Sequence, residues 1–250
     1  MIKVVFFDLY GTLLIFGDMN KAWKKWLSVF YASLKKNGLS ISLDEFSILC
    51  DNFMSGEEPQ FLERDFTLYE MRIKKFADDQ KLRISDNDIK KIAGMTVESW
   101  QSEVRVDPEA AAILKKLKKD YITGLVSNFD HPPHIHKLLS EYGLTELLDI
   151  IIISGEESVK KPDPEIFNRI FNSYDLQPGE VLFVGDSEED MNAAGNAGLH
   201  FALIERNNNV ESMNARDYTV SANVMRNTEF KEVIKISKLS DVCMIIDQIN

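Results

Sequence analysis

A carboxylate comes directly after a run of apolar residues near the start of the chain. Val4–Phe7 consists of β-branched and aromatic residues, and Asp8 follows immediately. Such a run is typical of a strand buried on both faces of a parallel sheet. Gly11 then breaks the strand, and Thr12 offers a hydroxyl group beside it. Because open α/β sheets carry their chemistry at the carboxyl ends of their strands, Asp8 is a candidate active-site carboxylate; the alternative is an Asp that only caps a turn.

Other polar residues occupy similar places later in the chain. Ser127 and Asn128 follow one predicted strand, and Asp186 follows another. Turns also favour Ser and Asn, so that pair has a plain structural alternative. The run from Ser187 to Asp190 resembles a capping box, which would serve only the helix that it starts.

The second half of the chain alternates predicted strands and helices. Strands are predicted over residues 121–126, 150–153, 181–184, 201–204 and 233–236. Helices are predicted over residues 107–119, 135–142, 163–171, 190–197 and 238–249. This alternation predicts an α/β fold, a Rossmann-like parallel sheet with helices on both faces. Residues 205–232 give no firm assignment, apart from a candidate short strand at 218–220.

The segment between the first strand and this alternation has a different character. Trp23, Trp26 and Phe30 recur at three- and four-residue steps, which predicts an amphipathic helix. Further helices are predicted over residues 42–53, 67–76 and 85–100, with no convincing strand. We therefore predict a helical domain at residues 16–100, inserted into a core domain made of residues 1–15 and 101–250.

The composition narrows the classes of partner. The formal net charge of −11 argues against nucleic acid or an anionic membrane surface and suits a bound cation. No apolar run is long enough to span a membrane, and the N-terminus lacks the features of a signal peptide. Cys50 and Cys243 are expected to be buried free thiols in a reducing compartment. We therefore expect a cytoplasmic protein, a monomer or homodimer, that acts on a small-molecule substrate.

Four short blocks together resemble the haloacid dehalogenase (HAD) superfamily. They occur in the family's order, each at a strand end or in the loop after it: Asp8-Leu9-Tyr10-Gly11-Thr12, Ser127-Asn128, Lys161-Pro162-Asp163-Pro164 and Gly185-Asp186-Ser187-Glu188-Glu189-Asp190. The first and last blocks are highly specific, whereas Ser-Asn and Lys-Pro are weak alone. The resemblance covers residues 1–14 and 104–204, and it implies that the inserted helices form the family's cap domain.

The resemblance implies a covalent mechanism. Asp8 would be the nucleophile, forming an aspartyl intermediate that water later hydrolyses. Lys161 would neutralise Asp8 and the negative charge of the substrate, although a lysine beside Lys160 could also be merely solvated. Ser127 and Asn128 would donate hydrogen bonds to the group that is transferred.

The resemblance also implies a magnesium site next to the substrate. Mg²⁺ would bind Asp8, the backbone carbonyl of Tyr10 and Asp186, because it prefers carboxylate and carbonyl oxygens. Asp190 would support this metal site, unless it serves only the capping box. Tyr10 and Thr12 would line the substrate site.

Tyr10 departs from the pattern of the family's phosphatases. Those enzymes carry an aspartate two residues after the nucleophile, which protonates the leaving alcohol and then activates water. A phenol titrates near ~10 and is a poor general acid–base at neutral pH. The family's 2-haloacid dehalogenases also carry tyrosine there, and halide needs no proton to leave.

The acidic residues between Asp186 and Asp190 favour a phosphatase instead. Those dehalogenases work without metal, and their last motif is largely neutral, whereas this chain keeps four acids between Asp186 and Asp190. They also hold the substrate carboxylate with an early cap arginine, and residues 15–56 contain none. We therefore predict a Mg²⁺-dependent phosphatase acting on a small phosphorylated metabolite. The alternatives are a metal-free 2-haloacid dehalogenase-like hydrolase and a non-catalytic binding or regulatory protein.

Several other residues are weaker candidates. His131, His134 and His136 could hold a transition metal, but surface positions at a helix start are the favoured interpretation. Arg64, Arg72 and Lys74 lie in the helical insert and could reach a substrate.

Overall fold

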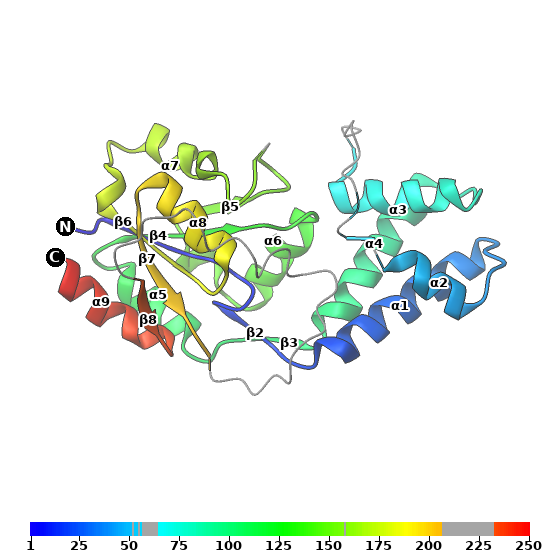
Figure 1. Ribbon diagram of the computed structural model, residues 1–250, viewed down its shortest axis with the longest axis horizontal. Coiled ribbons are helices and arrows are strands. Elements are labelled where there is room, and N and C mark those ends of the chain that lie inside the picture. Colours follow the sequence, from blue (N-terminus) through cyan, green and yellow to red (C-terminus); the bar gives the residue numbers. More distant parts are fainter. Residues whose placement is uncertain (52, 55, 57–64, 158, 207–232) are drawn as a thin grey trace. The chain divides into compact units, whose positions relative to one another are not determined.

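The computed structural model describes residues 1–51, 53–54, 56, 65–157, 159–206 and 233–250. Among the described residues, the chain forms two compact units, one from Met1–Ile15 together with residues 106–206 and 233–250, and one from Phe16–Arg105 (Figure 1). The helical unit thus ends five residues beyond the boundary at residue 100 expected from the sequence. No helix among the described residues is long and apolar enough to cross a membrane.

The first unit is built on a six-stranded parallel sheet. Its strand order is β5-β4-β1-β6-β7-β8, with every neighbouring pair parallel. The strands are β1 (Val4–Phe7), β4 (Ile122–Ser127), β5 (Ile150–Ile153), β6 (Val181–Gly185), β7 (His200–Ile204) and β8 (Ile234–Ile236). The apolar runs that predicted buried strands form the centre of the sheet, and β1 is fully buried between β4 and β6. The predicted α/β fold is confirmed.

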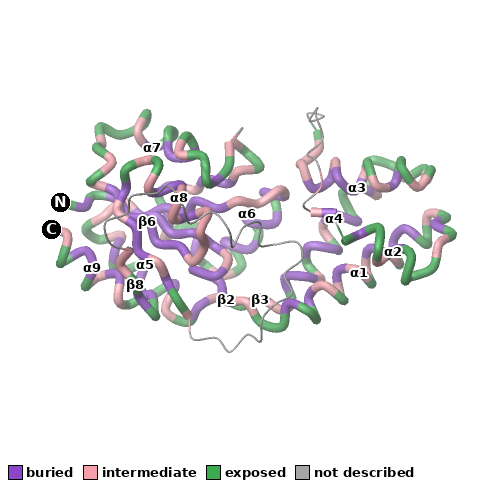
Figure 2. Tube along the Cα trace, viewed as in Figure 1, coloured by how far each residue is buried: buried purple, intermediate pink, exposed green. Residues whose placement is uncertain are grey.

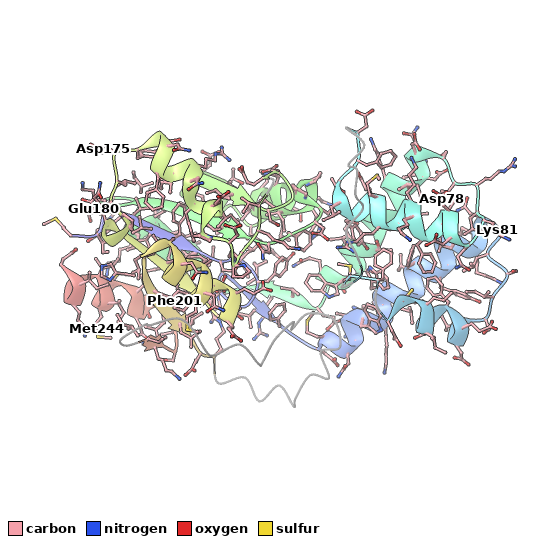
Figure 3. All side chains as sticks on the ribbon, turned by 45° about the horizontal axis from the view of Figure 1, so that its top comes forward. Asp78, Lys81, Asp175, Glu180, Phe201 and Met244 are labelled. Carbon is pink, nitrogen blue, oxygen red and sulfur yellow. The ribbon has the colours of Figure 1, made fainter. Side chains whose placement is uncertain are left out.

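Helices cover both faces of this sheet (Figure 1). They are α5 (Ala110–Leu117), α6 (Pro132–Glu141), α7 (Asn168–Ser173), α8 (Glu188–Ala197) and α9 (Val242–Ile249), with the 3₁₀ turns η1 (Thr145–Leu147), η2 (Pro164–Phe167), η3 (Pro178–Glu180) and η4 (Leu239–Asp241). On one face, apolar residues of η2, α7 and α8 pack with Val4, Phe6 and Phe201, the last labelled on β7 in Figure 3. Strand side chains alternate between faces, so Val5 and Phe7 point to the other face.

Some boundaries differ from the prediction. The short link after the first strand contains β2 (Leu14–Phe16), which pairs with an unpredicted strand, β3 (Val104–Val106), in a separate two-stranded sheet. The helix predicted from residue 107 begins at Ala110, because the Asp107 carboxylate accepts a hydrogen bond from the Glu109 N–H in a turn. The helix predicted from residue 163 begins as the 3₁₀ turn η2, and the candidate strand at 218–220 lies outside the described residues.

The second unit is helical, as its apolar periodicity predicted. Its helices are α1 (Met19–Lys36), α2 (Leu43–Cys50), α3 (Leu68–Asp79) and α4 (Asp86–Gln101). Ser42, Thr67 and Ser85 cap the last three. Stacked and edge-on aromatic rings fill its interior, where the Trp26 indole N–H donates to the Tyr69 hydroxyl at 2.7 Å. Figure 2 shows the buried stripes of these helices, a small core separate from that of the sheet.

Candidate active site

Asp8 lies at the carboxyl end of the central strand β1. Its backbone N–H donates to the carbonyl of Val184 on β6 at 2.9 Å, which extends the sheet by one residue and fixes the main chain under the carboxylate. Only 6% of Asp8 is exposed. An interior carboxylate must be paired or hydrogen-bonded, so its partners define the chemistry of this site.

Lys161 provides the positive charge beside Asp8. Its Nζ donates to Asp8 Oδ1 and to Asp190 Oδ1, each at 2.6 Å, and to the Val126 carbonyl at 3.1 Å. These three acceptors use all three N–H groups of the ammonium. The side chain is 3% exposed, so the solvated-lysine alternative is wrong. The two carboxylates outweigh burial and raise the pKa of Lys161, which keeps it charged.

Asn128 holds the main chain of Lys161 in place. Its Oδ1 accepts from the Lys161 N–H at 2.9 Å, and its Nδ2 donates to the Lys161 carbonyl at 2.9 Å and to Glu189 Oε2 at 3.2 Å. Both N–H groups of the side-chain amide therefore donate to acceptors within the protein. Its expected donation to a substrate stays a prediction, and its observed contacts position Lys161. Ser127, the residue before Asn128 in the chain, is the last residue of β4 and is buried.

Asp190 combines the two roles that the sequence left open. With Ser187 it forms a complete capping box at the start of α8. Its Oδ2 accepts from the Ser187 N–H at 3.1 Å and from the Ser187 hydroxyl at 2.6 Å, while Oδ1 accepts from Lys161. Asp190 is completely buried. The cap thus fixes the carboxylate that in turn fixes the lysine.

Three carboxylates converge beside this single lysine. Among the described residues, oxygens of Asp8, Asp186 and Asp190 lie within 4.8 Å of one another. Burial raises the pKa of Asp8 to about 7, with Asp190 adding to the rise and Lys161 opposing it. Burial and the nearby charges of Asp8 and Asp190 raise the pKa of Asp186 as well. The cluster therefore carries more negative charge than Lys161 compensates, which favours a bound cation.

The loop after Asp8 packs directly against Asp186. Gly11 has a φ of 91°, and a Cβ at this position would lie 2.0 Å from Asp186 Oδ2. Only glycine is compatible with both the backbone conformation and this close approach. The Thr12 side chain is completely buried, and its hydroxyl has no hydrogen-bond partner. Thr12 therefore lies inside the loop.

An aromatic pair borders the same loop. The ring of Tyr10 stacks on Phe129 at 5.4 Å between centroids, and Phe129 stacks on His134 at 5.9 Å. Phe129 was missed in the sequence, although it follows Asn128 at the end of β4 and its position was itself a signal. His131 and His134 are buried, so their assignment to the surface was wrong, whereas His136 pairs with Glu156 at the surface.

The remaining sequence candidates make contacts of their own. In the helical unit, Arg72 is buried and donates to the Gly56 carbonyl, and Lys74 lies over the ring of Phe66. Arg64 lies outside the described residues. Cys50 is buried as expected, but Cys243 is only partly buried; both are free thiols.

The sequence of this chain matches a known family of enzymes. Residues 2–198 match the family model of the haloacid dehalogenase-like hydrolases. The chain therefore belongs to the haloacid dehalogenase-like hydrolase family, and the resemblance seen in its four sequence blocks is confirmed.

Two relatives of this chain are named for different reactions. Over 98 residues the chain is 33% identical to a glyceraldehyde 3-phosphate phosphatase from Pyrococcus furiosus, covering 38% of this chain and 40% of that protein. Over 112 residues it is 31% identical to (S)-2-haloacid dehalogenase 4A from Burkholderia cepacia, covering 44% and 48% of the two chains. The aligned part thus spans less than half the length of these relatives. The fold resembles that of YfnB from Bacillus subtilis, solved bound to magnesium, with a TM-score of 0.57, 17% identity and coverage of 98% and 99%.

Proposed function

We propose that this hydrolase is a Mg²⁺-dependent phosphatase that acts on a small phosphorylated metabolite through a covalent intermediate on Asp8. The observation that carries the proposal is the cluster of Asp8, Asp186 and Asp190 around a single lysine. Two chemistries occur among its relatives, and this concentration of negative charge supports the metal-dependent one. A carboxylate-bearing or phosphorylated substrate would be repelled by the cluster unless a cation lay between them.

The residues present fit a magnesium ion. Mg²⁺ takes oxygen ligands and keeps several waters, so Asp8, Asp186 and the backbone carbonyl of Tyr10 would suffice to hold it. Both oxygens of Asp190 already accept hydrogen bonds from Lys161 and Ser187, so we assign Asp190 to supporting the site through the lysine. When bound, the ion would neutralise the phosphoryl oxygens and keep Asp8 ionised at neutral pH.

Asp8 would perform the chemistry in two displacements. Its Oδ1 accepts the hydrogen bond from Lys161, so we expect Oδ2 to attack phosphorus. The new O–P bond forms as the ester P–O bond breaks, and the leaving oxygen takes that electron pair and then a proton from water. A water molecule then attacks the phosphorus of the aspartyl phosphate, and the P–O bond to Asp8 breaks. The electron pair of that bond restores the Asp8 carboxylate, and the oxygen and protons of the water leave with inorganic phosphate. Lys161 would stabilise the charge on Asp8 and on the phosphoryl oxygens throughout.

Tyr10 supports a second candidate, a 2-haloacid dehalogenase-like activity. Its phenol stacks on Phe129 and lies where the family's phosphatases carry a carboxylic acid. A halide leaves without a proton, and one relative is a haloacid dehalogenase. In that reaction Asp8 would attack carbon and displace halide, forming an ester that water hydrolyses.

A substrate panel with and without Mg²⁺ separates these candidates. We expect 4-nitrophenyl phosphate and acetyl phosphate to be hydrolysed with Mg²⁺, and excess EDTA to stop this. Release of halide from 2-chloropropionate in EDTA, without phosphate release from any substrate, would replace the proposal with the dehalogenase. The Asp8→Asn variant controls for contaminating activity in both assays.

A further inference from the structure

Arg206 holds the loop that follows the nucleophile. It lies two residues after β7, and its guanidinium reaches the main chain between Asp8 and β2. Its Nε donates to the Gly11 carbonyl at 3.1 Å, and its Nη2 donates to the Thr12 carbonyl. Its Nη1 forms an ion pair with Asp107, whose side chain is 4% exposed. The N–H groups of the guanidinium form a rigid planar fork that spans these three acceptors, whereas the ammonium of lysine is a single compact donor on a flexible stem.

Asp107 extends this attachment to a third loop residue. Its backbone N–H donates to the Leu13 carbonyl at 2.9 Å, while its Oδ1 accepts from the Glu109 N–H at 2.7 Å. The carbonyls of Gly11, Thr12 and Leu13 are therefore all bound by the Arg206–Asp107 pair. Within the loop itself, the Gly11 N–H donates to the Leu14 carbonyl at 2.7 Å, and the Leu14 N–H donates to the Leu9 carbonyl at 2.8 Å.

The loop bound in this way determines the space around the metal-binding carboxylates. Gly11 packs so closely on Asp186 that a Cβ would overlap its Oδ2. A shift of the loop would therefore change the room available to Asp186, and it would also move the Tyr10 carbonyl, the adjacent peptide group. The geometry points to Arg206 as a positioning residue, which holds the loop in the conformation that binds the cation. Its catalytic consequence rests on the proposed phosphatase function.

A simpler role must be separated from this one. Arg206 could serve only to neutralise the buried Asp107 and so stabilise the fold. The Arg206→Met variant alone leaves that carboxylate unpaired and mixes both effects. The double variant Arg206→Met/Asp107→Asn removes the buried charge while keeping an oxygen that can accept from the Glu109 N–H. Lys235→Met is the matched control, because it removes an exposed cation that pairs with Glu205, the neighbour of Arg206.

Three measurements decide the proposal. The first is hydrogen–deuterium exchange in peptides that contain Gly11 and Leu14. Loss of two loop hydrogen bonds is expected to speed exchange there by about tenfold to a hundredfold, with no change in β6. The second is Mg²⁺ affinity by calorimetry, which should weaken by about tenfold. The third is kcat on 4-nitrophenyl phosphate, which should fall by a similar factor. Lys235→Met should match the wild type in all three.

The double variant gives the critical comparison. We expect its melting temperature to exceed that of Arg206→Met while its loop exchange and Mg²⁺ affinity stay impaired. Wild-type exchange around Gly11 and Leu14 in the double variant would overturn the proposal. If the double variant does not fold, Arg206→Lys keeps a cation for Asp107 and should show intermediate loop exchange; wild-type exchange in Arg206→Lys would likewise overturn it. Exchange needs neither metal nor substrate, so a wild type inert towards phosphates would refute the proposed function and leave this test valid.

Discussion

Replacing Asp8 with asparagine should abolish turnover and yet stabilise the metal-free protein at neutral pH. The amide is close in shape to the carboxylate, but it cannot serve as an anionic nucleophile. It also removes one negative charge from the cluster of Asp8, Asp186 and Asp190, in which Lys161 pairs with Asp8 and Asp190. Lys161 keeps Asp190 as an ionic partner at 2.6 Å, so the variant leaves no uncompensated ammonium.

The size of the stability gain follows from the pKa of Asp8. Burial raises this pKa from 3.8 to about 7. Well below the ordinary pKa of 3.8, Asp8 is protonated in both the folded and the unfolded chain, so it contributes nothing to the pH dependence of the free energy of unfolding. As pH rises further, the unfolded chain loses the proton first, so the free energy of unfolding falls until the pH passes about 7. At about 1.4 kcal/mol per pKa unit, the cost above pH 7 is at most roughly 4 kcal/mol.

Urea unfolding followed by circular dichroism measures this cost. Wild type, Asp8→Asn and Asp78→Asn should be compared in EDTA at pH 5 and pH 8. Asp78 lies exposed at the end of α3 (Figure 3) and controls for the loss of a carboxylate at the surface. The advantage of Asp8→Asn over wild type should grow with pH, and that of Asp78→Asn should not. Excess Mg²⁺ should stabilise the wild type more than Asp8→Asn, because only the wild type has the full set of ligands.

Two results would refute this reasoning. If Asp8→Asn is no more stable than wild type at pH 8, the cluster does not hold the excess negative charge inferred from the structure. If Asp8→Asn retains full turnover on any substrate that the wild type accepts, Asp8 is not the nucleophile.

Three further predictions test the neighbouring residues. Lys161→Met should lose activity and about 3–5 kcal/mol of unfolding free energy, because two carboxylates lose a buried partner. Lys160→Met is the control at an exposed site, and an equal unfolding free energy for the two variants would contradict the prediction. Mg²⁺ affinity measured by calorimetry should fall as the pH drops below about 7, because protons compete for Asp8, and pH-independent binding between pH 6 and 8 would argue against ligation by Asp8. Wild type should prefer aryl and acyl phosphates, and Tyr10→Asp should raise alkyl phosphate rates most, by up to ~10²–10⁴-fold; a folded variant without any gain would exclude a simple missing-acid explanation.

The sequence by itself predicted the parallel sheet, the inserted helices and the family. Those predictions rest on local information. The apolar run Val4–Phe7, with its β-branched and aromatic residues, favours a buried strand, and the three- and four-residue steps around Trp26 favour a helix. The sequence also identified candidate active-site residues such as Asp8, because residues that follow the strands of a parallel sheet lie at one edge of it. The family resemblance implied that Asp8, Asp186 and Asp190 share one site, and their carboxylate oxygens lie within 4.8 Å of one another.

The tertiary structure decided what each side chain does once it is there. Asn128 hydrogen-bonds the main chain of Lys161, a contact that was not predicted, and Asp190 joins a helix cap to that lysine. Arg206 binds a loop 194 residues earlier in the chain, and Asp107, the first residue of a predicted helix, is its ionic partner. Hydrogen-bond partners at such separations depend on how strands are ordered in the sheet. Periodicity and propensity describe only neighbours along the chain, so they determine which residues reach the edge of the sheet and not which of them bind each other.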